Sequence, residues 1–164
     1  VKMSAKKYKV GIVIGRFQPF HLGHKYIIEK AIDNVDRLIL GIGAADVRDV
    51  DNPYDVKKRV EFLNKFVKEE KLEKKISRIV PLNNHPDDAI WLKNLLKKTG
   101  KIDVVIGNNE WVNGIFENAK IPALRIGHYK RNILEGTKIR KLMRENKKWE
   151  TRVPKYLLKH IVKP

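Results

Sequence analysis

The residues best suited to chemistry stand in one short string, GRFQPFHLGH, over residues 15–24. It holds two histidines three residues apart, His21 and His24, and one arginine, Arg16. If the string opens a helix, both imidazoles lie on one face and can meet at one point. A helix start also offers unpaired N–H groups and a partial positive charge, to which an arginine adds a bidentate donor. The string therefore predicts a phosphate site.

The glycines of this string fit the same interpretation. Gly15 permits a tight turn after the preceding apolar run, and Gly23 removes a side chain where a phosphate must approach the backbone. Two other interpretations exist, because a histidine at a helix start is often only a polar cap and two histidines at this spacing can bind a metal. No HExxH-type glutamate or third nearby ligand accompanies the pair, so we expect no zinc site.

A second candidate anion site is the string EGTKIR over residues 135–140. Gly136 and Thr137 can begin a helix, with the Thr137 hydroxyl facing a phosphate or a backbone N–H. Arg140 follows one turn later and points the same way. Alone, this string is typical of an ordinary helix cap with a solvated arginine. Together with residues 15–24 it favours a polyphosphate ligand.

The elements that must position these residues follow from apolar patterning. We expect strands at residues 8–14, 37–42, 76–82, 102–106 and 122–126. We expect helices at residues 22–34, 56–67 (capped by Asp55), 88–98, 109–118, 136–146 and 154–162. This alternation predicts one doubly wound parallel α/β sheet, with ligands outside the carboxyl ends of the strands. We expect a single domain over residues 8–164 and a disordered tail over residues 1–7.

The charge balance is strongly basic, with 36 Lys plus Arg against 19 Asp plus Glu and a net charge of +17. Such a charge favours either nucleic-acid binding or a lysine-rich solvated surface that attracts a phosphorylated substrate. The lysines gather in helical stretches such as residues 57–75 and 138–148, interleaved with glutamate and without an aromatic ladder. This distribution favours the second interpretation.

Several function classes are excluded by composition. The chain has no cysteine, hence no disulfide, thiol nucleophile or thiolate metal site. No stretch approaches the ~20 apolar residues of a membrane span, and the N-terminus lacks the apolar run of a signal peptide. We expect a cytoplasmic protein that does not bind a membrane.

The motifs resemble those of the HxGH nucleotidyltransferases and, within them, the archaeal-type nicotinamide mononucleotide adenylyltransferases. The likeness runs from Val10 to about Lys155. The family opening GRxQPFHxGH is matched at residues 15–24 and its closing SGTxxR at residues 135–140, where Glu135 replaces the serine. The other matches are an aromatic helix start at Ala89-Ile90-Trp91 and a pair after the fourth strand, Gly107-Asn108.

The resemblance implies a Rossmann-like fold and transfer of AMP from ATP to nicotinamide mononucleotide, forming NAD and pyrophosphate. It implies catalytic roles for His21, His24 and Arg16, with His24 the stronger candidate for stabilising the transition state. It implies ATP binding by Gly15, Phe17, Gln18, Gly23, Gly107, Asn108, Gly136, Thr137 and Arg140. Mg²⁺ or another divalent cation would accompany ATP and needs few or no dedicated protein ligands.

The resemblance also implies where the acceptor binds. Trp91 would stack on the nicotinamide ring and Asn84 and Asp88 would bind its carboxamide, although Trp91 can equally be a core residue of its helix. Asn84 and Asp88 stand where the family has Asp and Asn, and Arg48 is the nearest substitute for a missing family arginine.

Other acceptors and other functions stay open at this stage. Nicotinate mononucleotide, flavin mononucleotide and phosphopantetheine undergo the same chemistry, but flavin and pantetheine relatives more often open with Gly-Thr-Phe-Asp. A nucleic-acid-binding module is less favoured because it leaves His21, Gly23 and His24 unexplained. We further expect a homo-oligomer.

Overall fold

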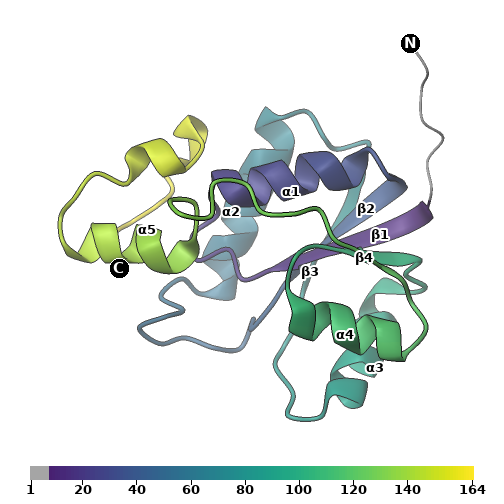
Figure 1. Ribbon diagram of the computed structural model, residues 1–164. Helices are drawn as coiled ribbons and strands as arrows, with labels where there is room; N and C mark the ends of the chain where they lie inside the picture. Colours follow the sequence, from purple (N-terminus) through teal and green to yellow (C-terminus); the bar gives the residue numbers. More distant parts are fainter. Residues whose placement is uncertain (1–7) are drawn as a thin grey trace.

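The computed structural model describes residues 8–164 and contains one parallel sheet in the order β3-β2-β1-β4-β5 (Figure 1). The strands are β1 (Tyr8–Gly15), β2 (Val35–Ile42), β3 (Ile76–Pro81), β4 (Val104–Ile106) and β5 (Ala123–Leu124). The helices are α1 (Leu22–Ile32), α2 (Val56–Glu69), α3 (Asp88–Thr99), α4 (Glu110–Asn118) and α5 (Gly136–Arg144). Two 3₁₀ turns follow, Glu150–Arg152 and Lys155–Leu157. The predicted single-domain, doubly wound α/β fold is confirmed.

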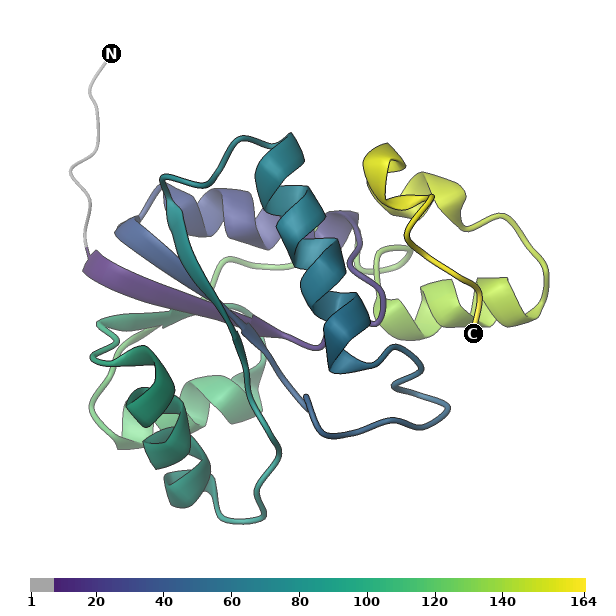
Figure 2. The same cartoon turned by 180° about the vertical axis from the view of Figure 1, so that it is seen from behind.

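Helices cover both faces of the sheet because its central strands are apolar on both sides. Val13 of β1 belongs to a core shared with α1, α2 and α5, whereas the preceding residue, Ile12, belongs to a core shared with α3 and α4. The two layers are visible from both sides of the molecule (Figures 1 and 2). The alternation along β1 thus places its carboxyl end between two helical layers.

The order of the strands creates a switch point beside β1. The chain runs outward from β1 through β2 to β3, then returns to place β4 and β5 on the other side of β1. β1 pairs with β2 from Tyr8 to Gly15, but with β4 only at Gly11 and Ile12. Open α/β sheets bind ligands where the crossover direction reverses, outside the carboxyl ends of the strands. The string at residues 15–24 starts at this point, and α5 lies beyond it (Figure 1).

The C-terminal segment differs most from the sequence prediction. The expected helix over residues 154–162 is replaced by the 3₁₀ turn Lys155–Leu157 and a further turn. Leu157 and Ile161 are buried in the core with helical i, i+4 spacing, which explains the misleading apolar pattern. The Tyr54 hydroxyl holds the end of this segment by donating to the carbonyl of Val162 at 2.8 Å.

Other boundaries shift by a few residues. β5, at the sheet edge, pairs only as Ala123–Leu124 instead of residues 122–126.

Between residues 8 and 164 no helix combines the length and apolar content that crossing a membrane requires. The predicted disordered tail, residues 1–7, lies outside the described residues. The domain limits, the cytoplasmic location and the homo-oligomer stay predictions.

Candidate active site

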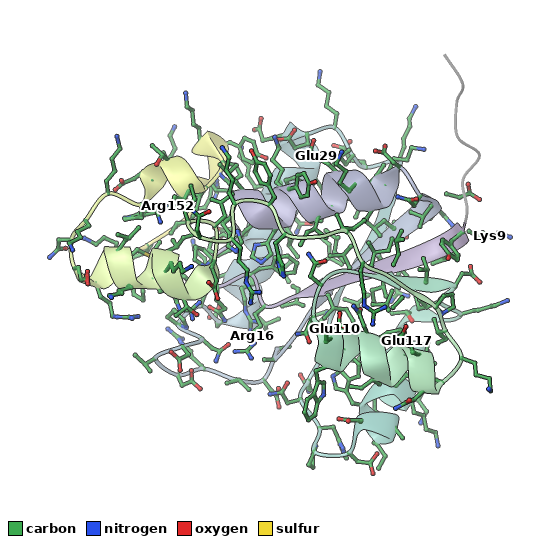
Figure 3. The ribbon with its side chains drawn as sticks, viewed as in Figure 1. Lys9, Arg16, Glu29, Glu110, Glu117 and Arg152 are labelled. Carbon is green, nitrogen blue, oxygen red and sulfur yellow. The ribbon has the colours of Figure 1, made fainter. Side chains whose placement is uncertain are left out.

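Both predicted anion strings line one cavity of about 430 Å³, here called the motif hollow. Residues 15–24 reach it from the loop between β1 and α1, and residues 135–140 reach it from the start of α5. Arg16, which is exposed at the end of β1, lies on its rim (Figure 3). The predicted residues that line the hollow are Arg16, Phe17, Gln18, His21, Gly23, His24, Gly136, Thr137 and Arg140. The structure thus brings together two strings that are separated by more than a hundred residues of sequence.

The two histidines form a capping box at the start of α1. Nδ1 of His21 accepts the Gly23 N–H at 3.0 Å, and Nδ1 of His24 accepts the His21 N–H at 3.1 Å. Their ring centroids are 3.7 Å apart. A neutral imidazole that accepts at Nδ1 carries its proton at Nε2. Each histidine is therefore both a cap and a donor of a second hydrogen bond through Nε2–H.

Both imidazoles are neutral at pH 7 in the ligand-free protein. Burial, followed by the nearby charge of Arg140, lowers the pKa of His21 to about 3. Burial, followed by His21, also lowers the pKa of His24 well below its ordinary value. Neutral Nε2–H groups donate hydrogen bonds to an anion without an excess positive charge that has to be desolvated before the anion binds.

These pKa values predict a loss of stability in acid. The unfolded chain binds a proton at each histidine below the ordinary pKa of 6.5, whereas the folded chain does not. The stabilisation is therefore complete above about pH 6.5 and is lost as the pH falls toward the lowered pKa of each histidine, which is about 3 for His21, at up to ~1.4 kcal/mol per pH unit for each group. Urea unfolding at pH 7 and pH 4.5 should show this slope, and the double variant His21→Asn/His24→Asn should show a shallower one. Equal slopes in the two proteins contradict the assignment.

Both helix starts were predicted to bind anions, and that of α5 is the less occupied by side chains. At the start of α1 the imidazoles accept the N–H groups of His21 and Gly23, whereas Glu135 at the N-cap of α5 makes no side-chain cap bond. The first backbone bond of α5 joins the Ile139 N–H to the Glu135 carbonyl, so the N–H groups before it have no partner inside the helix. Because Glu135, Gly136 and Thr137 line the motif hollow, this positive helix end opens into it.

Arg140 links the two strings. Its Nη1 donates to the carbonyl of Gln18 at 2.8 Å, and its Nη2 donates to the Thr137 hydroxyl at 3.4 Å. Its Nε is buried without a protein partner. A Cβ at Gly136 would lie 2.9 Å from Nη1, which explains the glycine there. A buried guanidinium N–H without a partner in the protein can donate a hydrogen bond to a ligand oxygen.

Three residues of the opening string have structural roles that the sequence did not indicate. The Gln18 amide donates to the Tyr54 carbonyl at 3.0 Å and accepts the Tyr54 N–H at 2.9 Å, so it ties the string to the start of α2. Phe17 is fully buried with φ +56°, so the tight turn occurs there rather than at Gly15. A Cβ at Gly23 would lie 2.8 Å from the His21 ring, so this glycine makes room for an imidazole and not only for a phosphate.

In the predicted pair Gly107-Asn108, the asparagine side chain is engaged by the backbone of Gly127. The Asn108 side chain donates to the Gly127 carbonyl at 2.9 Å and accepts the Gly127 N–H at 2.8 Å, which occupies both ends of its amide. Neither Gly107 nor Asn108 lines the motif hollow, whereas Asn109 does. Asn109 also caps α4 by accepting N–H groups from its first turn. ATP binding by Gly107 and Asn108 stays a prediction, and Asn109 is a lining residue that the sequence did not single out.

A second cavity of about 420 Å³, the tryptophan hollow, adjoins the first. It gathers the predicted acceptor residues Asn84, Asp88 and Trp91 at the start of α3. Trp91 is half-buried and meets Phe116 edge to face at 6.3 Å, so it packs on the core and lines the hollow at once. Gly15, predicted to bind ATP, lines this second cavity instead. Arg16 and Asn109 line both cavities, so the two hollows share a wall.

Arg48 is not brought to this site. Its guanidinium lies 4.0 Å from the Asp55 carboxylate and lines a separate hollow that ends at the C-terminal Pro164. The chain after β2 turns away through the bridge between Asp49 and Asn52 before α2 begins. Although Arg48 stands close to the Asn52-Pro53 turn in sequence, it lines a different hollow from Trp91.

Several lining residues were missed by sequence reasoning. Trp111, in the first turn of α4, is 71% exposed on the rim of the tryptophan hollow. Glu110 and Glu117 both belong to α4 (Figure 3), and Arg125 pairs with both and so holds the helix. In the motif hollow the loop before α5 contributes His128, Tyr129 and Arg131. An exposed tryptophan was a signal in principle, but only the fold places it beside Trp91.

Comparisons with known proteins identify the family of the chain. The model of the cytidylyltransferase-like family matches residues 12–152. A nicotinamide-nucleotide adenylyltransferase of Methanocorpusculum labreanum is 36% identical over 88% of this chain and 85% of its own. Its counterpart in Archaeoglobus fulgidus is 35% identical over 86% and 83%.

A solved structure shares the fold. The bifunctional NMN adenylyltransferase/ADP ribose pyrophosphatase of Francisella tularensis superposes with a TM-score of 0.78 at 21% identity. The match covers 89% of this chain but only 45% of that protein, so the chain spans less than half of its length. From the family match and the two sequence relatives, the chain belongs to the cytidylyltransferase-like family and, within it, to the nicotinamide-nucleotide adenylyltransferases.

Proposed function

We propose that the chain transfers AMP from ATP to nicotinamide mononucleotide, forming NAD and pyrophosphate. The observation that carries this proposal is the shared wall of the two hollows. The motif hollow offers donors suited to a triphosphate, and the tryptophan hollow offers an aromatic ring with amide and carboxylate groups. Arg16 and Asn109 stand where a phosphate from each side would meet.

The reaction joins the two ligands at the α-phosphorus of ATP. An oxygen of the acceptor phosphate attacks this phosphorus, and the bond to the oxygen bridging the α- and β-phosphorus breaks, so that pyrophosphate leaves with the electron pair. The attacking phosphate is an anion at neutral pH and needs no general base. Catalysis then consists of alignment and of neutralising charge on the leaving group.

Each group of the motif hollow has a place in this scheme. The Nε2–H groups of His21 and His24 donate to the triphosphate, with His24 at the transferring phosphate. The N-terminus of α5 and the free Nε–H of Arg140 bind the leaving pyrophosphate, and Arg16 holds the two reacting phosphates together. Mg²⁺ or another divalent cation enters with ATP as part of the substrate and needs few or no dedicated protein ligands.

An acceptor panel tests the function directly. Pyrophosphate release from ATP should require nicotinamide mononucleotide, and chromatography should identify NAD as the second product. Flavin mononucleotide and phosphopantetheine should give no release above the background without acceptor. A chain that releases pyrophosphate only with one of these other phosphates keeps the chemistry and loses the proposed acceptor.

The tryptophan hollow predicts a preference for the amide over the acid. Ionised Asp88 only accepts hydrogen bonds, so it favours a carboxamide and repels a carboxylate. We expect a higher kcat/KM for nicotinamide mononucleotide than for nicotinate mononucleotide, a smaller difference in Asp88→Asn, and a KM raised ~5–150-fold for both acceptors in Trp91→Ala. Trp91→Phe, which keeps a ring, is the matched control. A lower melting temperature of Trp91→Ala with parental acceptor KM would make Trp91 a core residue only.

A further inference from the structure

Arg59, in the first turn of α2, heads the group of large, fully buried side chains in the described part of the chain. Its described hydrogen bonds all end on backbone carbonyls. Nη1 donates to Arg16 at 3.1 Å and Gly43 at 2.8 Å, Nη2 donates to Ala44 at 3.0 Å, and Nε donates to Asp55 at 3.3 Å. One guanidinium thus ties α2 to the carboxyl ends of β1 and β2.

Burying a cation that is held only by carbonyls costs more free energy than burying an apolar side chain. Burial lowers the pKa of Arg59, which reflects the cost of desolvating its charge. Apolar residues of similar volume commonly replace buried charges without loss of stability. The contacts of Arg59 therefore call for an explanation beyond packing.

The carbonyls that Nη1 binds each precede a residue in the left-handed conformation. Phe17 follows Arg16 with φ +56°, and Ala44 follows Gly43 with φ +49°. Such angles are uncommon for residues other than glycine. In a trans peptide the carbonyl and the N–H point in opposite directions. Because Arg59 binds both carbonyls, they point toward α2, and the N–H groups of Phe17 and Ala44 point away from it.

These peptide planes lie where the ligands of the proposed function must bind. Phe17 lines the motif hollow, and Gly43 and Ala44 line the tryptophan hollow. A carbonyl oxygen that faces a phosphate repels it, whereas an N–H attracts it. Resting on the proposed function, which makes both ligands anions, we infer that Arg59 is a positioning residue that turns the carbonyls at the ends of β1 and β2 away from the substrates.

The test separates positioning from packing. Arg59→Lys keeps the charge but loses the planar fork that spans both turns, and Arg59→Met keeps only the volume. Leu63→Ala, at a fully buried position one turn along α2, is the matched control for lost stability. All are compared at one temperature well below every melting temperature. The readouts are KM and kcat, together with the calorimetric Kd of pyrophosphate, which needs no acceptor.

We expect kcat/KM to fall ~10–150-fold in both Arg59 variants, mostly through KM, and the Kd of pyrophosphate to rise with it. Leu63→Ala should lose melting temperature and keep the parental KM and Kd. Parental KM and Kd in a folded Arg59→Lys overturn the inference. So does failure of both variants to fold, since Arg59 would then serve the fold alone. If the parent makes no NAD but binds pyrophosphate more tightly than the Arg59 variants do, the proposed acceptor is refuted and the positioning role stays intact.

Discussion

Replacing His24 by alanine should lower the turnover number by ~10²–10³, the usual effect of removing one transition-state donor. The reason is the Nε2–H that His24 presents to the motif hollow while its Nδ1 caps the His21 N–H. Because burial lowers the pKa of His24 well below its ordinary value, the kcat profile should show no ionisation of His24 near pH 6.5. Steady-state rates at saturating substrates measure the effect.

Two further variants isolate catalysis from capping. His24→Asn supplies a side-chain oxygen for the cap but lacks the Nε2–H, so it should be as slow as alanine and more stable. His160→Ala removes a histidine that pairs with Glu61 and lines neither hollow, so it should keep the parental turnover number. A folded His24→Ala enzyme with parental turnover removes His24 from the mechanism.

Replacing Arg140 by lysine should weaken ATP binding ~10–150-fold, because hydrogen bonds to charged groups contribute ~1.5–3 kcal/mol. Lysine keeps the charge but loses the fork that contacts Gln18 and Thr137 and leaves Nε–H for a phosphate. Direct calorimetry with ATP measures the dissociation constant. Arg144→Lys, an exposed change in the last turn of the same helix, is the control. Equal ATP affinity of Arg140→Lys and the parent refutes the role.

Much of the fold was predictable because local and tertiary preferences agree. Residues 10–14 form an apolar run that ends at Gly15, and this run lies in the central strand β1. Asp55 precedes an amphipathic stretch and caps α2 as expected by accepting the Lys58 N–H. The histidine string is informative because its residues act through adjacent backbone and depend little on distant contacts.

What could not be predicted depends on distant contacts. Arg59 stands among the lysines of α2 and looks like another solvated cation, until the ends of β1 and β2 enclose it. Asn108 and Asn109 are chemically identical neighbours. They differ because a contact distant in sequence, with Gly127, occupies the side chain of Asn108, whereas Asn109 lines the motif hollow. Leu157 and Ile161 mimic a helix because a packed 3₁₀ turn can bury residues at the same spacing.

The wall that Arg16 and Asn109 give to both hollows affects how turnover ends. A molecule that reaches across this wall loses its translational and rotational freedom once, yet makes the contacts of two separate ligands. When one half of a dinucleotide formed in place is bound, the other half is held next to its own hollow at a high effective concentration. We therefore expect its affinity to exceed that of either mononucleotide, and escape of the joined product to limit the rate once the phosphorus chemistry is fast.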